Sequence, residues 1–345
     1  METTLKIGMP AGSLADPNRG GNLVNLLANS GFNVSGYAQG GPTKFTLVNY
    51  LFGWDGRPQE FGSQLEINEI DVAIAGDDWI KERILEMKLE YGREVNLERV
   101  LALNRGGVKL VGIVAGDEFD TVEDFLKNLC SQKKLITVVS EMPYLALDWL
   151  RTKLDAIGLL DKFQEFSVQK YKTPSKIKSG IVIYETWGKT EAKIKNGGAD
   201  IGLEITQSGS AIKNYGLKII DTVMVSQSSI WINSDVKKNA DKLELLSMFL
   251  LNLYGSINAE NKMMVMFNVP NKNVTEIECY LREKKLFADE PTVSVGKEFS
   301  VYNVQIDAGN KDEPLAKVRY ELAKRGATSI NTLPIQSSIP NISVI

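Results

Sequence analysis

One recurring pattern constrains the fold of this chain more than any other feature. An apolar run of strand length ends in a turn of small or polar residues, and a segment with helical apolar spacing follows it. The pattern occurs at residues 69–85, 109–129, 134–154, 181–197 and 199–217. Strands that alternate with helices in this way favour parallel sheets. The sequence therefore predicts an α/β fold.

Two of these units share a more detailed shape. In IDVAIAG (70–76) and ADIGLEIT (199–206), an acidic residue opens a buried strand that ends at a small or polar turn. Two α/β lobes with a cleft at the carboxyl ends of their strands would bring both turns to one ligand. This layout resembles periplasmic-binding-protein-like folds. We predict one lobe from residues 1–108 with 218–260 and a second from residues 109–217.

The segment after Asn261 has a different order of elements. The patterns read strand, helix, strand, strand, helix, strand, at residues 262–270, 274–283, 291–296, 299–307, 313–326 and 327–335. This order predicts a ferredoxin-like βαββαβ domain, which can bury its own sheet face under two helices. We therefore predict a third domain, residues 262–345, with a regulatory role.

Composition removes several classes of function. The 345 residues include no histidine, which excludes Ser-His-Asp and Cys-His catalysis and histidine-ligated metal sites. Lys and Arg number 40 against 43 Asp and Glu, and this near-neutral balance argues against a nucleic-acid partner. No apolar stretch approaches the roughly 18 residues of a membrane span, so we expect no membrane partner.

The cysteines and the N-terminus indicate a compartment. Cys130 and Cys279 lie far apart in apolar, helix-like surroundings, so we expect buried thiols and a cytoplasmic protein. The first residues lack the basic and apolar regions of a signal peptide. An enzyme of this composition would work with carboxylates, hydroxyls, Lys, Arg, backbone N–H groups and a hard metal such as Mg²⁺.

The motif that points most directly to chemistry lies at residues 200–217. Its strand ends near Glu204, and five residues then open a helix: Thr206, Gln207, Ser208, Gly209 and Ser210. Small residues let the backbone approach an anion, hydroxyls add donors, and the start of a helix presents N–H groups. The motif predicts a phosphate site with an acid beside it for ribose hydroxyls. The alternative is a capped helix with a polar first turn.

The same stretch resembles the phosphoribosyl-pyrophosphate loop of ATP phosphoribosyltransferase, the first enzyme of histidine biosynthesis. The family loop runs approximately A-D-x-I-x-D-x-V-x-T-G-x-T-L-x-x-N-G-L, against ADIGLEITQSGSAIKNYGL here. Further segments are similar to the family in the same order: LKIGMPAGSL, DVAIAGDDWIKE, RGGVKLVGIVAG, ITVVSEMPYL and TWGKTEAKIKNGGADI. The tail from PTVSVG to ATSINTLPI resembles the regulatory domain of the long form, so the resemblance covers nearly the whole chain.

The resemblance implies a reaction and its residues. N1 of the adenine of ATP would displace pyrophosphate from C1 of phosphoribosyl pyrophosphate, with Mg²⁺ carried by the substrates rather than by direct protein ligands. Glu191 and Asp200 would hold ribose hydroxyls or metal-bound water, Glu204 would complete the catalytic acids, and residues 206–210 would cradle the 5′-phosphate. The ATP site would comprise Gly12, Ser13, Asp77, Asp78, Lys109 and Tyr144.

The resemblance also implies feedback control by histidine. The effector would bind at two turns of the third domain, one made by Pro291, Thr292 and Val293 and the other by Ala327, Thr328 and Ser329. AMP is a further expected ligand, and homo-oligomers from dimers to hexamers are the expected assemblies.

The chain departs from the family pattern at several positions. Ser13 stands where the family has a basic residue, Glu204 replaces an Asp, and Ala211 replaces the last Thr of the loop. Two alternatives therefore stay open. One is a phosphoribosyltransferase that takes another nucleophile, and the other is a non-catalytic small-molecule-binding protein.

Overall fold

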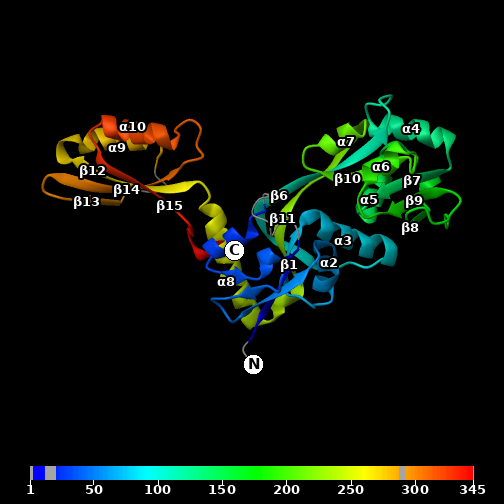
Figure 1. Ribbon diagram of the computed structural model, residues 1–345, viewed down its shortest axis with the longest axis horizontal. Coiled ribbons are helices and arrows are strands. Elements are labelled where there is room, and N and C mark those ends of the chain that lie inside the picture. Colours follow the sequence, from blue (N-terminus) through cyan, green and yellow to red (C-terminus); the bar gives the residue numbers. More distant parts are fainter. Residues whose placement is uncertain (1–2, 12–20, 287–291, 345) are drawn as a thin grey trace. The chain divides into compact units, whose positions relative to one another are not determined.

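The computed structural model describes residues 3–11, 21–286 and 292–344 (Figure 1). Its internal contacts divide the chain into two compact units. The first comprises Met1–Val24 with Val34–Leu245, and the second comprises Asn25–Asn33 with Leu246–Ile345.

The first unit is built on a nine-stranded sheet with helices packed against it. The strand order is β4-β1-β5-β11-β6-β10-β7-β9-β8 (Figure 1). β1 runs parallel to β4 and β5, and β7 runs parallel to β9 and β10, which confirms the predicted α/β class. The strands are β1 (Leu5–Pro10), β4 (Leu51–Gly56), β5 (Val72–Gly76), β6 (Leu97–Ala115), β7 (Leu135–Ser140), β8 (Phe166–Lys170), β9 (Gly180–Glu185), β10 (Ile201–Thr206) and β11 (Leu217–Asn233), with a separate pair β2 (Val34–Ser35) and β3 (Lys44–Phe45).

Two long strands, β6 and β11, run through the middle of this sheet. They pair antiparallel from Leu97 opposite Asn233 to Ala115 opposite Leu217, with several register shifts between these ends. β11 pairs with β5 at one end of the ladder, and β6 pairs with β10 at the other end. The sheet therefore has two parts, which we call lobe I (β1, β4 and β5) and lobe II (β7, β8, β9 and β10). The domain limits given by the sequence stay a prediction.

Helices cover both lobes. Lobe I carries α2 (Pro58–Glu66) and α3 (Asp77–Tyr91), and lobe II carries α4 (Val122–Gln132), α5 (Pro143–Ala156), α6 (Thr190–Lys195) and α7 (Ser210–Asn214). α4 begins where the sequence predicts, because the Thr121 hydroxyl accepts the N–H of Asp124 at 3.2 Å. α5 packs closely on β6 because Gly112 has no side chain. A Cβ at this position would lie 2.5 Å from the buried ring of Trp149.

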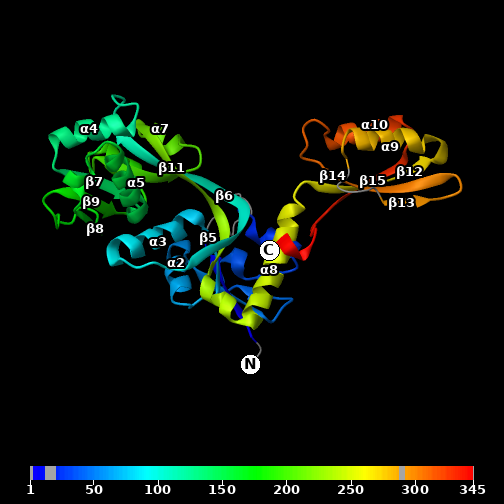
Figure 2. The same cartoon turned by 180° about the vertical axis from the view of Figure 1, so that it is seen from behind.

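The second unit is built on an antiparallel sheet with the order β13-β14-β12-β15. Its elements are β12 (Lys262–Pro270), α9 (Val274–Glu283), β13 (Thr292–Val295), β14 (Phe299–Asp307), α10 (Leu315–Lys324) and β15 (Thr328–Pro334). Both helices lie on one face of the sheet, as the two opposite views show (Figures 1 and 2). The Phe267 and Tyr302 rings stack at 5.5 Å in the core between them. The predicted ferredoxin-like domain is therefore present.

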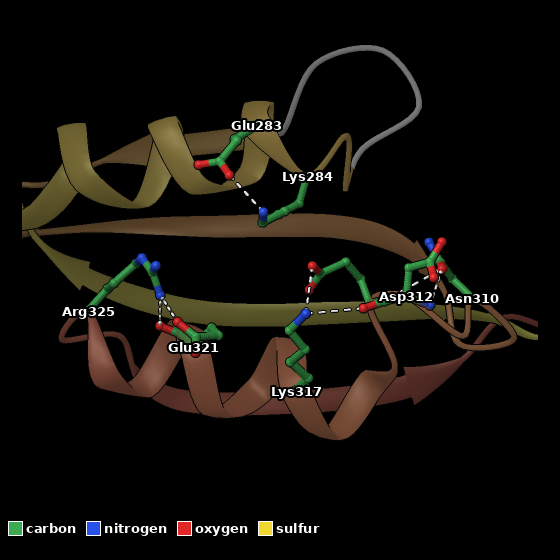
Figure 3. Close-up of polar contacts among 8 residues, drawn as sticks. Glu283, Lys284, Asn310, Asp312, Lys317, Glu321 and Arg325 are labelled. Atoms are coloured by element: carbon green, nitrogen blue, oxygen red, sulfur yellow. Dashed lines mark hydrogen bonds and ion pairs between the residues drawn. The ribbon is translucent and has the colours of Figure 1, made fainter.

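The helix layer of this second unit also holds a cluster of charged side chains (Figure 3). Lys317 pairs with Glu313 at 2.9 Å, and Arg325 pairs with Glu321 one turn away. Burial, the Glu313 charge and a hydrogen bond to Glu313 raise the pKa of Tyr280 to about 12. The layer therefore buries polar groups beside its ion pairs.

Several elements differ from the sequence predictions. Residues 58–66 form α2, which has no counterpart in the predicted elements, and β6 begins at Leu97 rather than near residue 109. α8 (Ala240–Asn258) has no counterpart in the predicted elements. The first half of β6 is partly exposed on both faces, so it carries polar residues that hide its strand pattern.

The expectation of buried thiols is wrong for Cys279, which is exposed, and Cys130 is half-buried. On α9 the buried face carries Ile277 and Leu281, and Cys279 lies two residues from each, on the other side of the helix. None of the described helices combines the length and the apolar character that crossing a membrane requires.

Candidate functional site

The strands of lobe II end at one edge of the sheet, where predicted site residues gather. β7, β9 and β10 are parallel neighbours, so their last residues, Ser140, Glu185 and Thr206, lie along the same edge. The helices α5, α6 and α7 begin just after these strands. We call this the carboxyl edge of lobe II. Ligands of open α/β sheets bind at such edges.

Two cavities open beside the carboxyl edge, and together we call them the cleft. The larger, of about 290 Å³, is lined by α2 and α3 of lobe I and by the start of α5 and the end of β9 in lobe II. The smaller, of about 170 Å³, is lined by Asp78, Ser226, Ser228 and Gln207, among others. Trp79 lines both cavities, so they adjoin.

The predicted phosphate loop lies at this edge with its polar groups accessible. The Thr206 hydroxyl accepts the N–H of Gly209 at 2.8 Å, and the Ser208 and Ser210 hydroxyl oxygens are 2.8 Å apart. Gln207, Ser208 and Ser210 are exposed. Gly209 has a φ of 74°, a conformation that side-chain-bearing residues rarely adopt. The turn therefore needs a glycine at this position.

Lys109 lies next to the phosphate loop. Residues 109 and 206 are directly opposite in the antiparallel pairing of β6 with β10, and Glu204 is opposite Val111. Directly opposite residues point to the same face of a sheet. The structure therefore brings Lys109, Thr206 and Glu204 to one face, with the exposed lysine beside the loop.

Three carboxylates lie within electrostatic reach of one another behind the loop. Burial, together with the charges of Glu191 and Glu141, raises the pKa of Glu204 to about 7. Burial and the Glu191 charge also raise the pKa of Glu141. Glu204 Oε1 accepts the N–H of Ile205 at 2.9 Å, and a hydrogen bond from the Thr190 hydroxyl opposes the rise of the Glu204 pKa. Glu191 and Glu204 are therefore brought together, along with Glu141, which the sequence analysis missed.

Asp200 is not part of this group. It precedes β10, at the opposite end of the strand from Thr206. Its Oδ2 accepts the Thr137 N–H at 2.8 Å and the Thr137 hydroxyl at 2.7 Å, and its Oδ1 pairs with Lys133. These contacts hold Asp200 at the amino end of β10. An extended strand separates it from Glu204, so the two acids do not form one site.

Asp77 and Asp78 open α3 and have different surroundings. Asp77 accepts hydrogen bonds from Trp231 Nε1 at 2.9 Å and from Arg99 at 3.1 Å, so its oxygens are engaged by the long strands β11 and β6. Asp78 lines the smaller cavity, and burial raises its pKa. Only one of the two neighbouring acids therefore faces the cleft, a difference that their sequence does not reveal. Gly12 and Ser13 lie outside the described residues.

Glu82 of α3 connects the two lobes. Its carboxylate accepts the backbone N–H groups of Tyr144 at 2.8 Å and Leu145 at 2.7 Å, in the first turn of α5. Burial raises the pKa of Glu82 to about 8, assisted by the charges of Glu86 and Glu185 and opposed by the two N–H groups. Tyr144 thus lies at the wall of the cleft, but through its backbone it also joins the lobes.

The two predicted effector turns lie on opposite edge strands of the second unit. Val293 of β13 pairs with Tyr302, and Thr328 of β15 pairs with Asn268. β14 and β12 separate these edges, at about 4.8 Å for each strand spacing. The turns are therefore not joined into one site within this unit. Pro291 lies outside the described residues, and the remaining predicted residues are Thr292, Ala327 and Ser329.

The family model for ATP phosphoribosyltransferase matches residues 57–253, more than half of the chain. The chain belongs to the ATP phosphoribosyltransferase family. It is therefore a transferase of the phosphoribosyltransferase type, from histidine biosynthesis.

Relatives match over nearly the full length. The ATP phosphoribosyltransferase of Geotalea daltonii is 26% identical over 98% of this chain and 100% of its own length. That of Nitratidesulfovibrio vulgaris (strain Miyazaki F) is 26% identical over 89% of each chain. Among solved structures, the ATP phosphoribosyl transferase (HisG:HisZ) complex from Thermotoga maritima covers 72% of this chain and 98% of its own, with 14% identity and a TM-score of 0.48.

The Glu82 contact predicts a pH-dependent stability. The pKa of Glu82 is about 8 in the folded chain against an ordinary 4.5, so the folded state binds more protons between these values. The free energy of unfolding should therefore fall as pH rises from 4.5 to 8, by on the order of 3–5 kcal/mol from this group. Urea denaturation across this pH range should show that the free energy of unfolding declines less with pH in Glu82→Gln than in the parent protein.

The exposed Glu118 provides the matched control. Glu118→Gln should leave the pH dependence unchanged. A decline of equal slope in the Glu82→Gln protein and the parent would assign the effect to other groups.

Proposed function

We propose that this enzyme transfers the phosphoribosyl group of phosphoribosyl pyrophosphate to N1 of the adenine of ATP and releases pyrophosphate. The observation that carries the proposal is the loop at residues 206–210 with Lys109 and Glu204 on the same face. The loop offers hydroxyl and N–H donors for the 5′-phosphate. Glu204, at the end of the strand, is suited to accept hydrogen bonds from ribose hydroxyls.

The reaction depends on the alignment of the two substrates more than on proton transfer. The C1–O bond to pyrophosphate breaks while the N1–C1 bond forms, and pyrophosphate leaves as a stable anion. Catalysis then comes from orienting two anionic substrates and neutralising the charge that develops. Lys109 contributes a positive charge beside the loop, and Glu191 and Glu204 orient the ribose. A chain without histidine can perform this reaction.

Mg²⁺ fits this arrangement as a partner of the substrates. Within the described ranges, no group of three or more Cys, Asp or Glu side chains is placed to hold a metal ion directly. The Glu204 carboxyl interacts with the Thr190 hydroxyl, and its remaining lone pairs are suited to accept a ribose hydroxyl or a metal-bound water. Mg²⁺ would supply charge neutralisation on the pyrophosphate. We assign its water contacts to Glu191 rather than Asp200, because Asp200 lies at the other end of β10.

The cleft suits ATP. Arg57 lines the larger cavity and offers a cation for phosphate groups, and Trp187 lines it with 75% of its side chain exposed. An exposed indole at a cavity rim is suited to stack on adenine. Asp78 and Tyr144 line the lobe I and lobe II walls. AMP, which has the same adenine as ATP, would occupy the same cavity.

The expected compartment is the cytoplasm, and the two free cysteines are compatible with it.

The test of the reaction is pyrophosphate release from ATP plus phosphoribosyl pyrophosphate. We expect release only when both substrates and Mg²⁺ are present. Release with phosphoribosyl pyrophosphate and a nucleophile other than ATP would identify a transferase with a different acceptor, which the loss of the hydroxyl at Ala211 favours. Tight binding of either substrate without any release would identify a small-molecule-binding protein.

The phosphate loop makes its own prediction. In Gly209→Val, the φ of 74° becomes strained and the added Cβ would lie 3.3 Å from Ile219 Cδ1, so the loop that faces the phosphate must shift. We expect affinity for phosphoribosyl pyrophosphate, measured by calorimetry, to fall at least about tenfold, or 1.4 kcal/mol. Gly197 has a φ of 68° and open space around it, so Gly197→Val imposes a similar strain outside the site. Equal losses of affinity in both variants would refute the proposal that residues 206–210 bind the 5′-phosphate.

We further propose that the second unit binds histidine as a feedback inhibitor. The buried pair of Tyr280 and Glu313, with the ion pairs around it, supports a polar effector in this unit. The turns at Thr292 and Thr328 lie on opposite edges, so a site that uses both would need two copies of the chain. This supports a homo-oligomer, from a dimer to a hexamer.

Histidine and substrate should affect each other's binding. A coupling free energy of about 1–3 kcal/mol is typical between two linked sites, and it must be equal in both directions. We expect histidine to weaken substrate binding to the full chain, and substrate to weaken histidine binding by the same factor. Full activity with saturating substrate and no response of either affinity to histidine would show that this unit senses another molecule or none.

A further inference from the structure

A third cavity lies at the opposite, amino end of the lobe II sheet. It has a volume of about 490 Å³ and is lined by the end of α4, by residues just before β7 and β9, and by the short helix Leu160–Phe163. β7 and β10 each span six residues, about 20 Å at 3.3 Å per residue. This cavity, which we call the amino-edge pocket, is therefore separate from the cleft, and the proposed reaction does not use it.

The lining of the amino-edge pocket is basic. Lys133, Lys134 and Lys162 line it, and none of its lining residues is acidic. Lys133 pairs with Asp200, whereas Lys134 and Lys162 form no ion pair within the described part of the chain. Uncompensated cations around a concave surface concentrate the positive potential there. The pocket is therefore suited to a ligand with more than one negative charge.

The other lining groups define the class of that ligand. The Ser179 hydroxyl and the Gln132 amide add neutral donors, while Phe163 and Cys130 form an apolar wall. Ammonium and hydroxyl donors suit phosphate oxygens. The volume lies in the range of small-molecule sites and exceeds what one phosphate group fills.

We propose that the amino-edge pocket binds a phosphate-bearing small molecule. Its phosphate group lies between Lys134 and Lys162, and its organic part lies against Phe163 and Cys130.

Cys130 gives a direct readout of occupancy, because Cys279 is the only other cysteine in the sequence. In a Cys279→Ser chain, the rate at which uncharged N-ethylmaleimide alkylates Cys130 reports access to the pocket. A ligand at about ten times its dissociation constant occupies some nine-tenths of the sites, so alkylation should slow about tenfold. The probes are AMP, adenosine and inorganic phosphate.

Two double variants separate the pocket from charge in general. Lys134→Glu/Lys162→Glu reverses the basic wall. Lys88→Glu/Lys176→Glu makes the same charge change at exposed lysines outside the pocket. We expect AMP to protect Cys130 in the parent and in the Lys88/Lys176 variant, and protection to be lost in the Lys134/Lys162 variant. Matching melting temperatures show that each variant is folded.

The outcomes distinguish the sources of the phosphate. Protection by AMP but not by inorganic phosphate identifies a phosphate ester as the ligand, and equal protection by inorganic phosphate identifies the free anion. Adenosine protecting as well as AMP, protection that survives in the Lys134/Lys162 variant, or no protection by any probe overturns the proposal. The readout does not depend on catalysis, so a negative transferase assay leaves it standing.

Discussion

The antiparallel ladder between β6 and β11 is the interaction on which the first unit depends. The two strands pair through both lobes, and the other strands of each lobe attach to opposite ends of that ladder. The backbone hydrogen bonds of this ladder oppose sliding of one lobe past the other. The pairing shifts register near Asn104 and Gly106, both of which have positive φ, so we expect any bending of the ladder there. Gly106 itself lines the cleft, so such bending would change the shape of the site.

The cleft carries acidic side chains in its walls, although the substrates proposed for it are anions. Its walls include the acids Glu82, Glu141 and Glu185, and two strongly anionic substrates would be repelled if all of them were ionised. Burial raises the pKa of Glu82 to about 8, which reduces this negative charge near neutrality, and burial raises the pKa of Glu141 as well. The cations Arg57 and Lys109 are exposed at the site and can meet phosphate groups without a large desolvation penalty.

The sequence predicts the strands β7, β9 and β10 because each contains an apolar, buried run, whereas β8, whose burial alternates, is missing from the predicted elements. The run at 181–184 is continuously apolar and buried, so its pattern is unambiguous. β11 is interrupted by register shifts, and the resulting irregular burial hides it. Asp200 and Glu204 look like one site in the sequence, although an extended strand separates them. Glu82 gives no local signal at all, because the N–H groups that it accepts lie 62 and 63 residues further along the chain.

Residues 25–33 belong to the second unit although they lie near the beginning of the chain. The Ser30 and Ser256 hydroxyls, 226 positions apart, are 2.9 Å from each other, and the Phe32 and Phe249 rings are 5.1 Å apart. The second unit is thus a discontinuous module, assembled from both ends of the polypeptide. During synthesis, residues 25–33 cannot make these contacts until the ribosome has produced α8. Recombination that exchanged only the C-terminal residues would separate residues 25–33 from α8, which they contact.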